Sequence, residues 1–154
     1  MLDSGFMRPV EFEKGEGGKV AWMLGRFELF SSLSQDQLLR LARYVSLRRY
    51  EEGELVIEKD DAGDAFFLIY SGGVEVTAPG LLGIEKLITR LGPGEFFGEL
   101  ALLLGQPRAA TVVCTEASEL FVLMSADFAR LVEGEPEVGA LVKQIAKARF
   151  EDRP

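Results

Sequence analysis

The segment from Gly94 to Ala110 contains the residues best suited to recognise a ligand. It begins with turn-forming residues, continues as a short apolar run and ends at Pro107-Arg108. Gly98 allows the chain to begin a short helix, whose first amide groups have no partners within the helix and therefore attract anions. Arg108 follows ten residues later and presents five N–H donors in one plane, which suits two-pronged contact with phosphate oxygens. The spacing therefore predicts a phosphate site.

Glu99 stands directly after the glycine at the start of this predicted helix. A carboxylate beside a phosphate is repelled unless it accepts a proton donor, and a ribose hydroxyl is such a donor. Phosphate and ribose hydroxyl together indicate a nucleotide. Three residues are small enough to let the backbone approach a ligand closely: Ala101, Ala109 and Ala110. From the residues alone, a structural ion pair between Glu99 and Arg108 is an equally good interpretation.

The elements around this segment change from helical to strand-like and back. Apolar residues between Val20 and Phe30 recur at helical spacing, and Ser34 with Gln37 forms a capping box at the start of a second helix. From residue 44 to 124 short apolar runs alternate with glycine turns, which predicts an antiparallel sheet with short connections. The expected strands are 55–57, 66–70, 74–77, 87–91, 111–114 and 120–124.

After the strands, Ser125 is expected to cap a short helix, and Pro136 to open a final helix that ends near Phe150. The predicted fold class is α+β and mainly β. It is an antiparallel β-roll or jelly roll with an N-terminal helical pair, a short helix in the 94–110 segment and C-terminal helices. We expect residues 1–18 to be a flexible tail or linker, 19–150 one domain, and 151–154 a tail.

Composition argues against several function classes. Seventeen basic and twenty-five acidic residues give a net charge of −8, which disfavours direct contact with nucleic acid. The absence of histidine removes Ser-His-Asp and Cys-His catalytic arrangements and the commonest metal ligand, so no metal is expected. Cys114 lies in a β-branched run and is predicted to be buried. With no long apolar stretch or signal-peptide layout, the chain is expected to be cytoplasmic and not to insert into a membrane.

The loop from Pro79 to Gly83 has an apolar tip, whereas polar residues are more usual at such a position. Leu81 and Leu82 at this tip either contact a partner or fold back on the domain. We expect them to fold back.

The segment from Gly94 to Val112 closely resembles the phosphate-binding cassette of cyclic-nucleotide-binding domains. Protein kinase A regulatory subunits, catabolite-activator proteins and cyclic-nucleotide-gated channels share this sensor. Gly53, the stretch 63–69 and Gly72-Gly73-Val74 are similar to the pattern that the family carries before its cassette. The resemblance covers about residues 20–150.

This resemblance implies a role for each matching residue. Arg108 is implied to bind the phosphate and Glu99 the ribose, with backbone amides near Gly98, Leu100 and Ala109 completing the phosphate cradle. A second group is implied to lie near the base or the pocket wall, although ordinary core packing is an equally good interpretation. This group consists of Val56, Phe96 and Val112.

The function implied by the resemblance is a regulatory module without catalysis that binds cAMP and passes the binding event on through its flanking helices. Weaker binding of cGMP is implied because family members that prefer cGMP often carry threonine at the position of Ala109. The attached effector is expected to be an ion channel, which would place the domain on the cytoplasmic side of a membrane. Alternatives are the sensor part of a transcription regulator without its DNA-binding domain, a degenerate protein-interaction domain and a nucleotide enzyme. Assembly into a homo-oligomer stays open.

Arg149 falls on the apolar face of the predicted final helix, four residues beyond Ile145. In one interpretation its aliphatic stem covers the barrel while its charge reaches water. In the other, its guanidinium stacks on or hydrogen-bonds the adenine base, as the lid residue does in similar channel domains, and Phe150 is the alternative cap.

Overall fold

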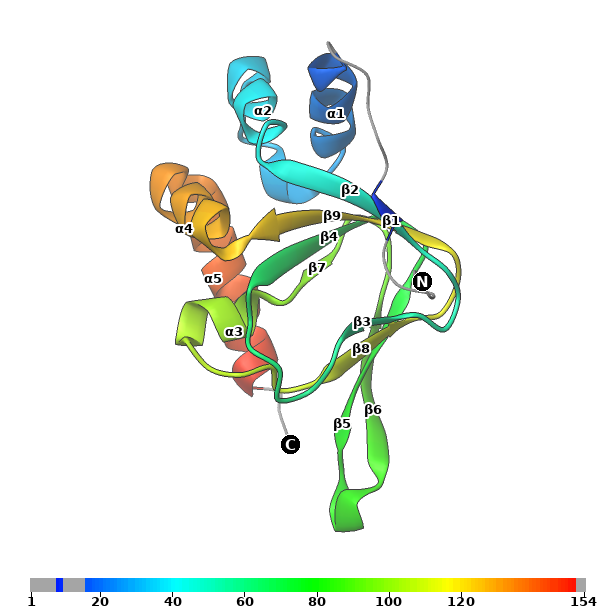
Figure 1. The fold of residues 1–154 in the computed structure, drawn as a ribbon. Helices are drawn as coiled ribbons and strands as arrows, with labels where there is room; N and C mark the ends of the chain where they lie inside the picture. Colours follow the sequence, from blue (N-terminus) through cyan, green and yellow to red (C-terminus); the bar gives the residue numbers. More distant parts are fainter. Residues whose placement is uncertain (1–7, 10–15, 152–154) are drawn as a thin grey trace.

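Two antiparallel sheets form the body of the domain in the computed structural model, which describes residues 8–9 and 16–151 (Figure 1). The strand order is β1-β2-β9-β4-β7 in the first sheet and β3-β8-β5-β6 in the second. The strands are β1 Arg8–Pro9, β2 Val45–Tyr50, β3 Leu55–Ile57, β4 Ala65–Ser71, β5 Val74–Pro79, β6 Glu85–Leu91, β7 Phe96–Phe97, β8 Thr111–Cys114 and β9 Ser118–Met124. The predicted antiparallel β-roll is confirmed.

Helices cover the outer face of the first sheet and one side of the roll (Figure 1). They are α1 Gly17–Leu24, the 3₁₀ helix η1 Glu28–Phe30, α2 Gln35–Leu41, α3 Glu99–Leu104, α4 Ser125–Gly134 and α5 Pro136–Glu151. The predicted capping box is present, because Gln37 N–H donates to Ser34 Oγ at 3.2 Å and Ser34 N–H donates to Gln37 Oε1 at 2.6 Å. None of the described helices combines the length and apolar character needed to cross a membrane.

Two details of the helix prediction are wrong. The single helix expected from Val20 to Phe30 is divided, since α1 ends at Leu24 and the extended backbone of Phe27 separates it from η1. Ser125 does not cap α4 but is its first residue, and no side chain caps that helix. The chain passes directly from β9 into α4, and Ser125 N–H donates to the Asp64 carbonyl at 2.9 Å.

Three strands were not predicted: β1, β2 and β7. β2 pairs with β9 along all six of its residues, but Arg48 and Arg49 interrupt its apolar pattern. β7 has only two residues, which pair with Leu68 and Phe67 of β4. Its brevity hides it from any analysis of periodicity.

The described elements extend slightly beyond the predicted domain of residues 19–150. Arg8–Pro9 pairs with β2, and α1 begins at Gly17, both within the predicted N-terminal tail. Residues 1–7 and 10–15 of that tail lie outside the described residues, as do residues 152–154 of the predicted C-terminal tail.

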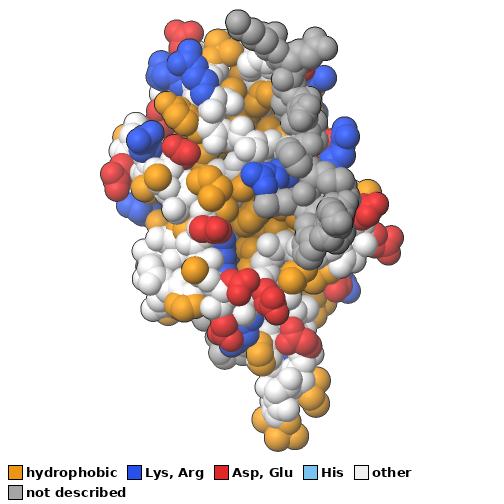
Figure 2. Space-filling model, in the orientation of Figure 1, with side chains coloured by type: hydrophobic (Ala, Val, Ile, Leu, Met, Phe, Trp, Pro, Cys, Tyr) orange, Lys and Arg blue, Asp and Glu red, His pale blue; other side chains and the backbone are white. Residues whose placement is uncertain are grey.

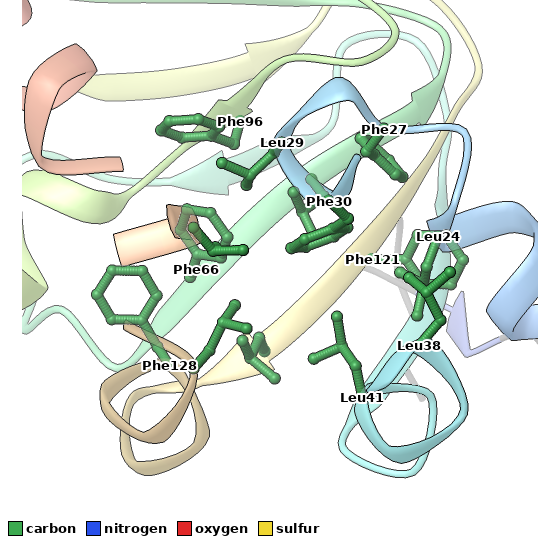
Figure 3. Packing of buried hydrophobic residues seen from close by; sticks show 14 of the residues in the cluster. Leu24, Phe27, Leu29, Phe30, Leu38, Leu41, Phe66, Phe96, Phe121 and Phe128 are labelled. Carbon is green, nitrogen blue, oxygen red and sulfur yellow. The ribbon is translucent and has the colours of Figure 1, made fainter. Parts of the chain in front are cut away.

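Two apolar clusters lie on opposite faces of β4, which explains its uninterrupted apolar run. Phe66 belongs to the cluster under the helices, where its ring centroid lies 5.3 Å from that of Phe96 and 4.7 Å from that of Phe128 (Figure 3). Phe67 belongs to the cluster inside the roll and stacks on Phe97 at 5.0 Å. The two aromatic residues of β7 are therefore anchored in different clusters, and they fix the chain just before the predicted cassette.

The hairpin of β5 and β6 extends well beyond the roll (Figure 1). Leu81 and Leu82, in the 3₁₀ turn η2 (Leu81–Gly83) at its tip, are 85% and 90% exposed. The expectation that they fold back on the domain is wrong. The β5–β6 hairpin extends away from the sheets, so its tip does not reach a surface on which Leu81 and Leu82 could pack.

Candidate functional site

Gly98 forms the sharp turn between β7 and α3. Its φ is +91°, a left-handed conformation that side chains other than glycine rarely adopt. A Cβ atom at this position would also lie 3.1 Å from Arg108 Nη1 and 3.1 Å from the Ala65 carbonyl oxygen. Both the conformation and the space therefore require glycine here, and the turn makes Glu99 the first residue of α3.

Glu99 is a carboxylate inside the protein, with only 1% of its surface exposed. Its Oε1 accepts a hydrogen bond from Arg149 Nη1 at 2.8 Å. Its Oε2 is buried and has no hydrogen-bond partner among the described residues. Because buried polar atoms in native proteins are almost always paired, this oxygen is an acceptor available to a ligand.

Arg108 is also buried, at 5% exposure, and is held at both its side chain and its backbone. Nη1 donates to the Gly98 carbonyl at 2.8 Å and Nη2 to the Ala65 carbonyl at 2.7 Å. The Arg108 N–H donates to the Asp61 carbonyl, and its carbonyl accepts from the Asp60 N–H, each at 2.8 Å. A guanidinium has five N–H donors, so donors remain for an anion.

Burial lowers the pKa of Arg108 from its usual value, and the nearby carboxylates of Asp64, Glu99 and Asp61 act in the opposite direction. The side chain stays charged, since an arginine pKa is far above neutrality. Arg108 and Glu99 form no direct ion pair, because the carboxylate of Glu99 is paired with Arg149. The interpretation of a structural pair between Glu99 and Arg108 is therefore wrong.

The end of α5 lies beside α3 (Figure 1), and Arg149 connects the two helices. Its guanidinium carbon lies 4.9 Å from the centroid of the Phe96 ring while its Nη1 bonds Glu99. The charge is thus directed at a buried carboxylate and not into water, contrary to the first interpretation of this residue. Phe150 is about half exposed at the end of the same helix.

The other predicted site residues are distributed around this centre. Ala101 is buried against the turn at Gly63, where an added Cβ would come within 2.5 Å of the alanine Cβ. In the rest of the cassette, Leu100 and Ala110 are half-buried and Ala109 is exposed. The three residues expected near the base or the wall divide between the clusters. Inside the roll lie Val56 and Val112, and under the helices lies Phe96.

Sequence reasoning found the charged residues of the site but missed the groups that hold them. Arg108 is positioned by the backbone carbonyls of Ala65 and Gly98. Every residue has such a carbonyl, so the residue types gave no indication of this role. Asp61 and Asp64 lie in the 58–65 turn. Gly63 and Asp64 belong to the 63–69 stretch of the family pattern, whereas Asp61 was not singled out from the sequence. No group of three or more His, Cys, Asp or Glu side chains in the described part of the chain is placed to hold a metal ion.

The chain is similar in sequence to a known protein family. The family model of the cyclic nucleotide-binding domain matches residues 47–135. A cyclic nucleotide-gated potassium channel of Mesorhizobium japonicum is 31% identical over 97% of this chain and 39% of its own length. A cyclic AMP receptor protein of Thermus thermophilus is 34% identical over 80% of this chain and 57% of its own length. The chain thus spans less than two thirds of the length of each of these relatives.

Solved structures show the same fold. The catabolite activator protein of Thermus thermophilus superposes with a TM-score of 0.72 at 31% identity, covering 80% of this chain and 58% of its own. The regulatory domain of Toxoplasma gondii protein kinase A, solved with cAMP, gives a TM-score of 0.66 at 30% identity, covering 77% and 45%. Together with the family match across β2 to α4, these likenesses show that the chain belongs to the cyclic nucleotide-binding domain family.

Proposed function

We propose that this domain binds cAMP in preference to cGMP and transmits the binding event to an attached effector through α5. The observation that carries the proposal is the buried Oε2 of Glu99, which has no hydrogen-bond partner among the described residues and lies at the start of α3, in the same cassette segment as Arg108. A ribose hydroxyl would satisfy this oxygen, and the remaining N–H donors of Arg108 would take the cyclic phosphate.

The choice of base rests on Ala109. This residue is exposed, and its methyl group provides no hydroxyl to bond the guanine amino group. Adenine needs no such partner, so cAMP would be favoured over cGMP.

The coupling to α5 rests on Arg149. Its side chain contacts Glu99, the proposed ribose ligand, and so α5 and the nucleotide would share one carboxylate. With Oε1 bound to the helix and Oε2 to the ribose, ligand binding would favour the docked position of the helix. Only such a difference in affinity between docked and undocked states can shift the equilibrium between them. Arg149 and Phe150 would then lie at the edge of the base site.

The proposed effector is an ion channel. The Mesorhizobium relative is a cyclic nucleotide-gated potassium channel, and this chain matches 39% of its length, which leaves room there for a separate effector. The domain would then lie on the cytoplasmic side of a membrane.

A sensor of the catabolite-activator kind is the second candidate. It is favoured by the Thermus receptor protein, which is 34% identical and which the chain covers over 57% of its length. A DNA-binding region elsewhere in the full protein would distinguish it from the channel.

The test is competition against a fluorescent cAMP analogue by cAMP and by 2′-deoxy-cAMP. Removing the hydroxyl leaves Glu99 Oε2 unpaired, so we expect 2′-deoxy-cAMP to bind at least about tenfold more weakly, as expected for a lost hydrogen bond of about 1.5–3 kcal/mol to a charged group. Chromatography of the recovered nucleotide should show unchanged cAMP. Equal affinity for both nucleotides would exclude the proposed role of Glu99, and conversion of cAMP to another product would favour an enzyme.

A further inference from the structure

The tip of the β5–β6 hairpin is an exposed apolar surface that the proposed nucleotide site does not use. Leu81 and Leu82 are 85% and 90% exposed, and Ile84 is 69% exposed. Figure 2 shows hydrophobic side chains at the end of the projection, away from the body of the domain. Monomeric proteins expose single apolar residues routinely, but a contiguous group at the end of a protrusion indicates a contact surface.

The charge of the hairpin differs from that of the rest of the chain. The tip from Pro79 to Ile84 contains no charged residue, and residues 74–91 contain two acidic and two basic residues, so that 2 − 2 = 0. The chain as a whole carries −8. The tip is thus an uncharged apolar point on an acidic molecule.

The backbone of the tip satisfies much of its own hydrogen bonding. Gly80 N–H donates to the Ile84 carbonyl at 2.6 Å, Gly83 N–H to the Gly80 carbonyl at 3.1 Å, and Ile84 N–H to the Leu81 carbonyl at 3.2 Å. Internal pairing of this kind lowers the cost of moving backbone groups out of water into an apolar medium. Leu82 takes a left-handed backbone conformation, with φ of 59°, within this closed turn.

Lys86 lies next to the apolar tip. A Cβ at Gly80 would be 3.3 Å from Lys86 Cβ and 3.8 Å from its Cδ, so the aliphatic stem of the lysine runs along the turn. Such a stem can lie among apolar groups while the ammonium stays at a polar boundary. Leucine and isoleucine lie at the end of the hairpin, and the lysine lies one step closer to the domain. This order matches that of a lipid surface, in which the phosphates lie outside the acyl chains.

We propose that the β5–β6 tip inserts into the surface of a zwitterionic lipid bilayer, with Leu81, Leu82 and Ile84 among the acyl chains and Lys86 at the phosphates. The expectation of no membrane insertion concerned long apolar segments, and a hairpin tip needs none. A second copy of the chain is the less suitable occupant, because three side chains on a narrow ribbon are far fewer than the roughly 20–30 residues per side of a stable protein interface.

Tryptophan fluorescence provides the direct test, because Trp22 on α1 is the only tryptophan in the chain. The variant Trp22→Phe/Leu81→Trp carries a single reporter at the tip, and the unaltered protein carries one on α1. With phosphatidylcholine vesicles, we expect a blue shift and quenching by acyl-chain bromolipids for the tip reporter, and neither for Trp22. An unchanged tip spectrum at millimolar lipid would overturn the proposal.

Vesicle flotation with the unaltered protein gives a second readout. Leu81→Ser/Leu82→Ser should reduce the bound fraction at least about tenfold, whereas Trp22→Ser, at another exposed apolar residue, should leave it unchanged. Added phosphatidylserine should not strengthen binding, given the net charge of −8. Binding that requires anionic lipid and disappears in salt would contradict insertion. A dimer in sedimentation velocity that the double serine variant abolishes would assign the tip to a second copy instead.

Discussion

At the scale of single residues, the site depends on two buried charges that do not neutralise each other. Arg108 is held by the carbonyls of Gly98 and Ala65, and Glu99 is held at one oxygen by Arg149. Each charge therefore keeps bonding capacity for a partner from outside the protein. In a structural ion pair the two charges would satisfy each other, whereas in this candidate site each charge can still bind a ligand.

Arg108→Lys should weaken cAMP binding at least about tenfold, because a point charge cannot replace the planar guanidinium that bonds two carbonyls and a phosphate together. Arg108→Ala should abolish binding and also lower the free energy of unfolding by about 1–3 kcal/mol for each carbonyl left without a donor. Titration calorimetry and urea denaturation measure the two effects. Arg130→Lys, at an exposed residue of α4, is the matched control. Near-normal affinity of a folded Arg108→Ala protein would refute the assignment.

Ala109→Thr should improve cGMP binding while leaving cAMP binding nearly unchanged. Ala109 is exposed, so a threonine fits without repacking, and its hydroxyl adds one net hydrogen bond of about 0.5–1.5 kcal/mol. Competition assays with both nucleotides measure the ratio. If the cGMP affinity is the same before and after the substitution, Ala109 does not determine the choice of base.

At the scale of elements, the site is assembled by three segments from distant parts of the chain. β7 and α3 supply Glu99, the 58–65 turn and β4 hold Arg108, and α5 supplies Arg149. The last of these contacts joins residues fifty positions apart, and it connects the proposed ligand site to the C-terminal helix.

Addition of cAMP should slow hydrogen exchange of the amides from Leu141 to Phe150. Binding at Glu99 favours the docked helix, and docking reduces the opening that exchange requires. Arg149→Ala should remove this protection, whereas Lys147→Ala, which deletes an exposed charge from the same helix, should retain it. Exchange in α5 that does not respond to cAMP in the unaltered protein would exclude the proposed coupling.

The sequence allowed most elements to be predicted, and the failures have local causes. Short apolar runs between glycines predicted strands reliably, but Arg48 and Arg49 concealed β2, which exists because β9 pairs with it. Glu99 and Arg108 were predicted because their types match a phosphate and a hydroxyl. The partner of Arg149 was not, since it depends on where α5 docks, and helical periodicity gives the face of a helix but not its neighbour.

At the scale of the whole molecule, the inside of the roll contains two groups whose ionisation is suppressed. Burial raises the pKa of Tyr50 from 10.0 to about 12, and burial raises the pKa of the Cys114 thiol from 9.0 to about 11. Cys114 is buried and free, as predicted. Both groups belong to the cluster inside the roll, so their titration reports on the integrity of the β-roll.

The free energy of unfolding should fall as the pH rises from about 9 to 12. Below pH 9 both groups are protonated in the folded and unfolded states, and their contribution is complete. Above pH 9 these groups lose their protons in the unfolded chain while the folded protein still holds them. Rising pH therefore favours unfolding until it exceeds the pKa values of the folded protein, about 11 for Cys114 and about 12 for Tyr50. Urea denaturation at pH 8 and pH 11 should show a smaller loss for Tyr50→Phe/Cys114→Ala than for the unaltered protein. Identical losses would mean that these groups are not protected by the fold.

Titration calorimetry of the purified, nucleotide-free protein with cAMP tests the proposed binding most directly. We expect one saturable site per chain with a dissociation constant in the micromolar range, the affinity that about 0.3 kcal/mol per heavy atom gives for a ligand of this size. Binding should be weaker for cGMP. If a folded protein gives no saturable heat up to about 1 mM cAMP, a concentration equivalent to only about −4.1 kcal/mol of binding free energy, the domain does not bind cAMP as proposed.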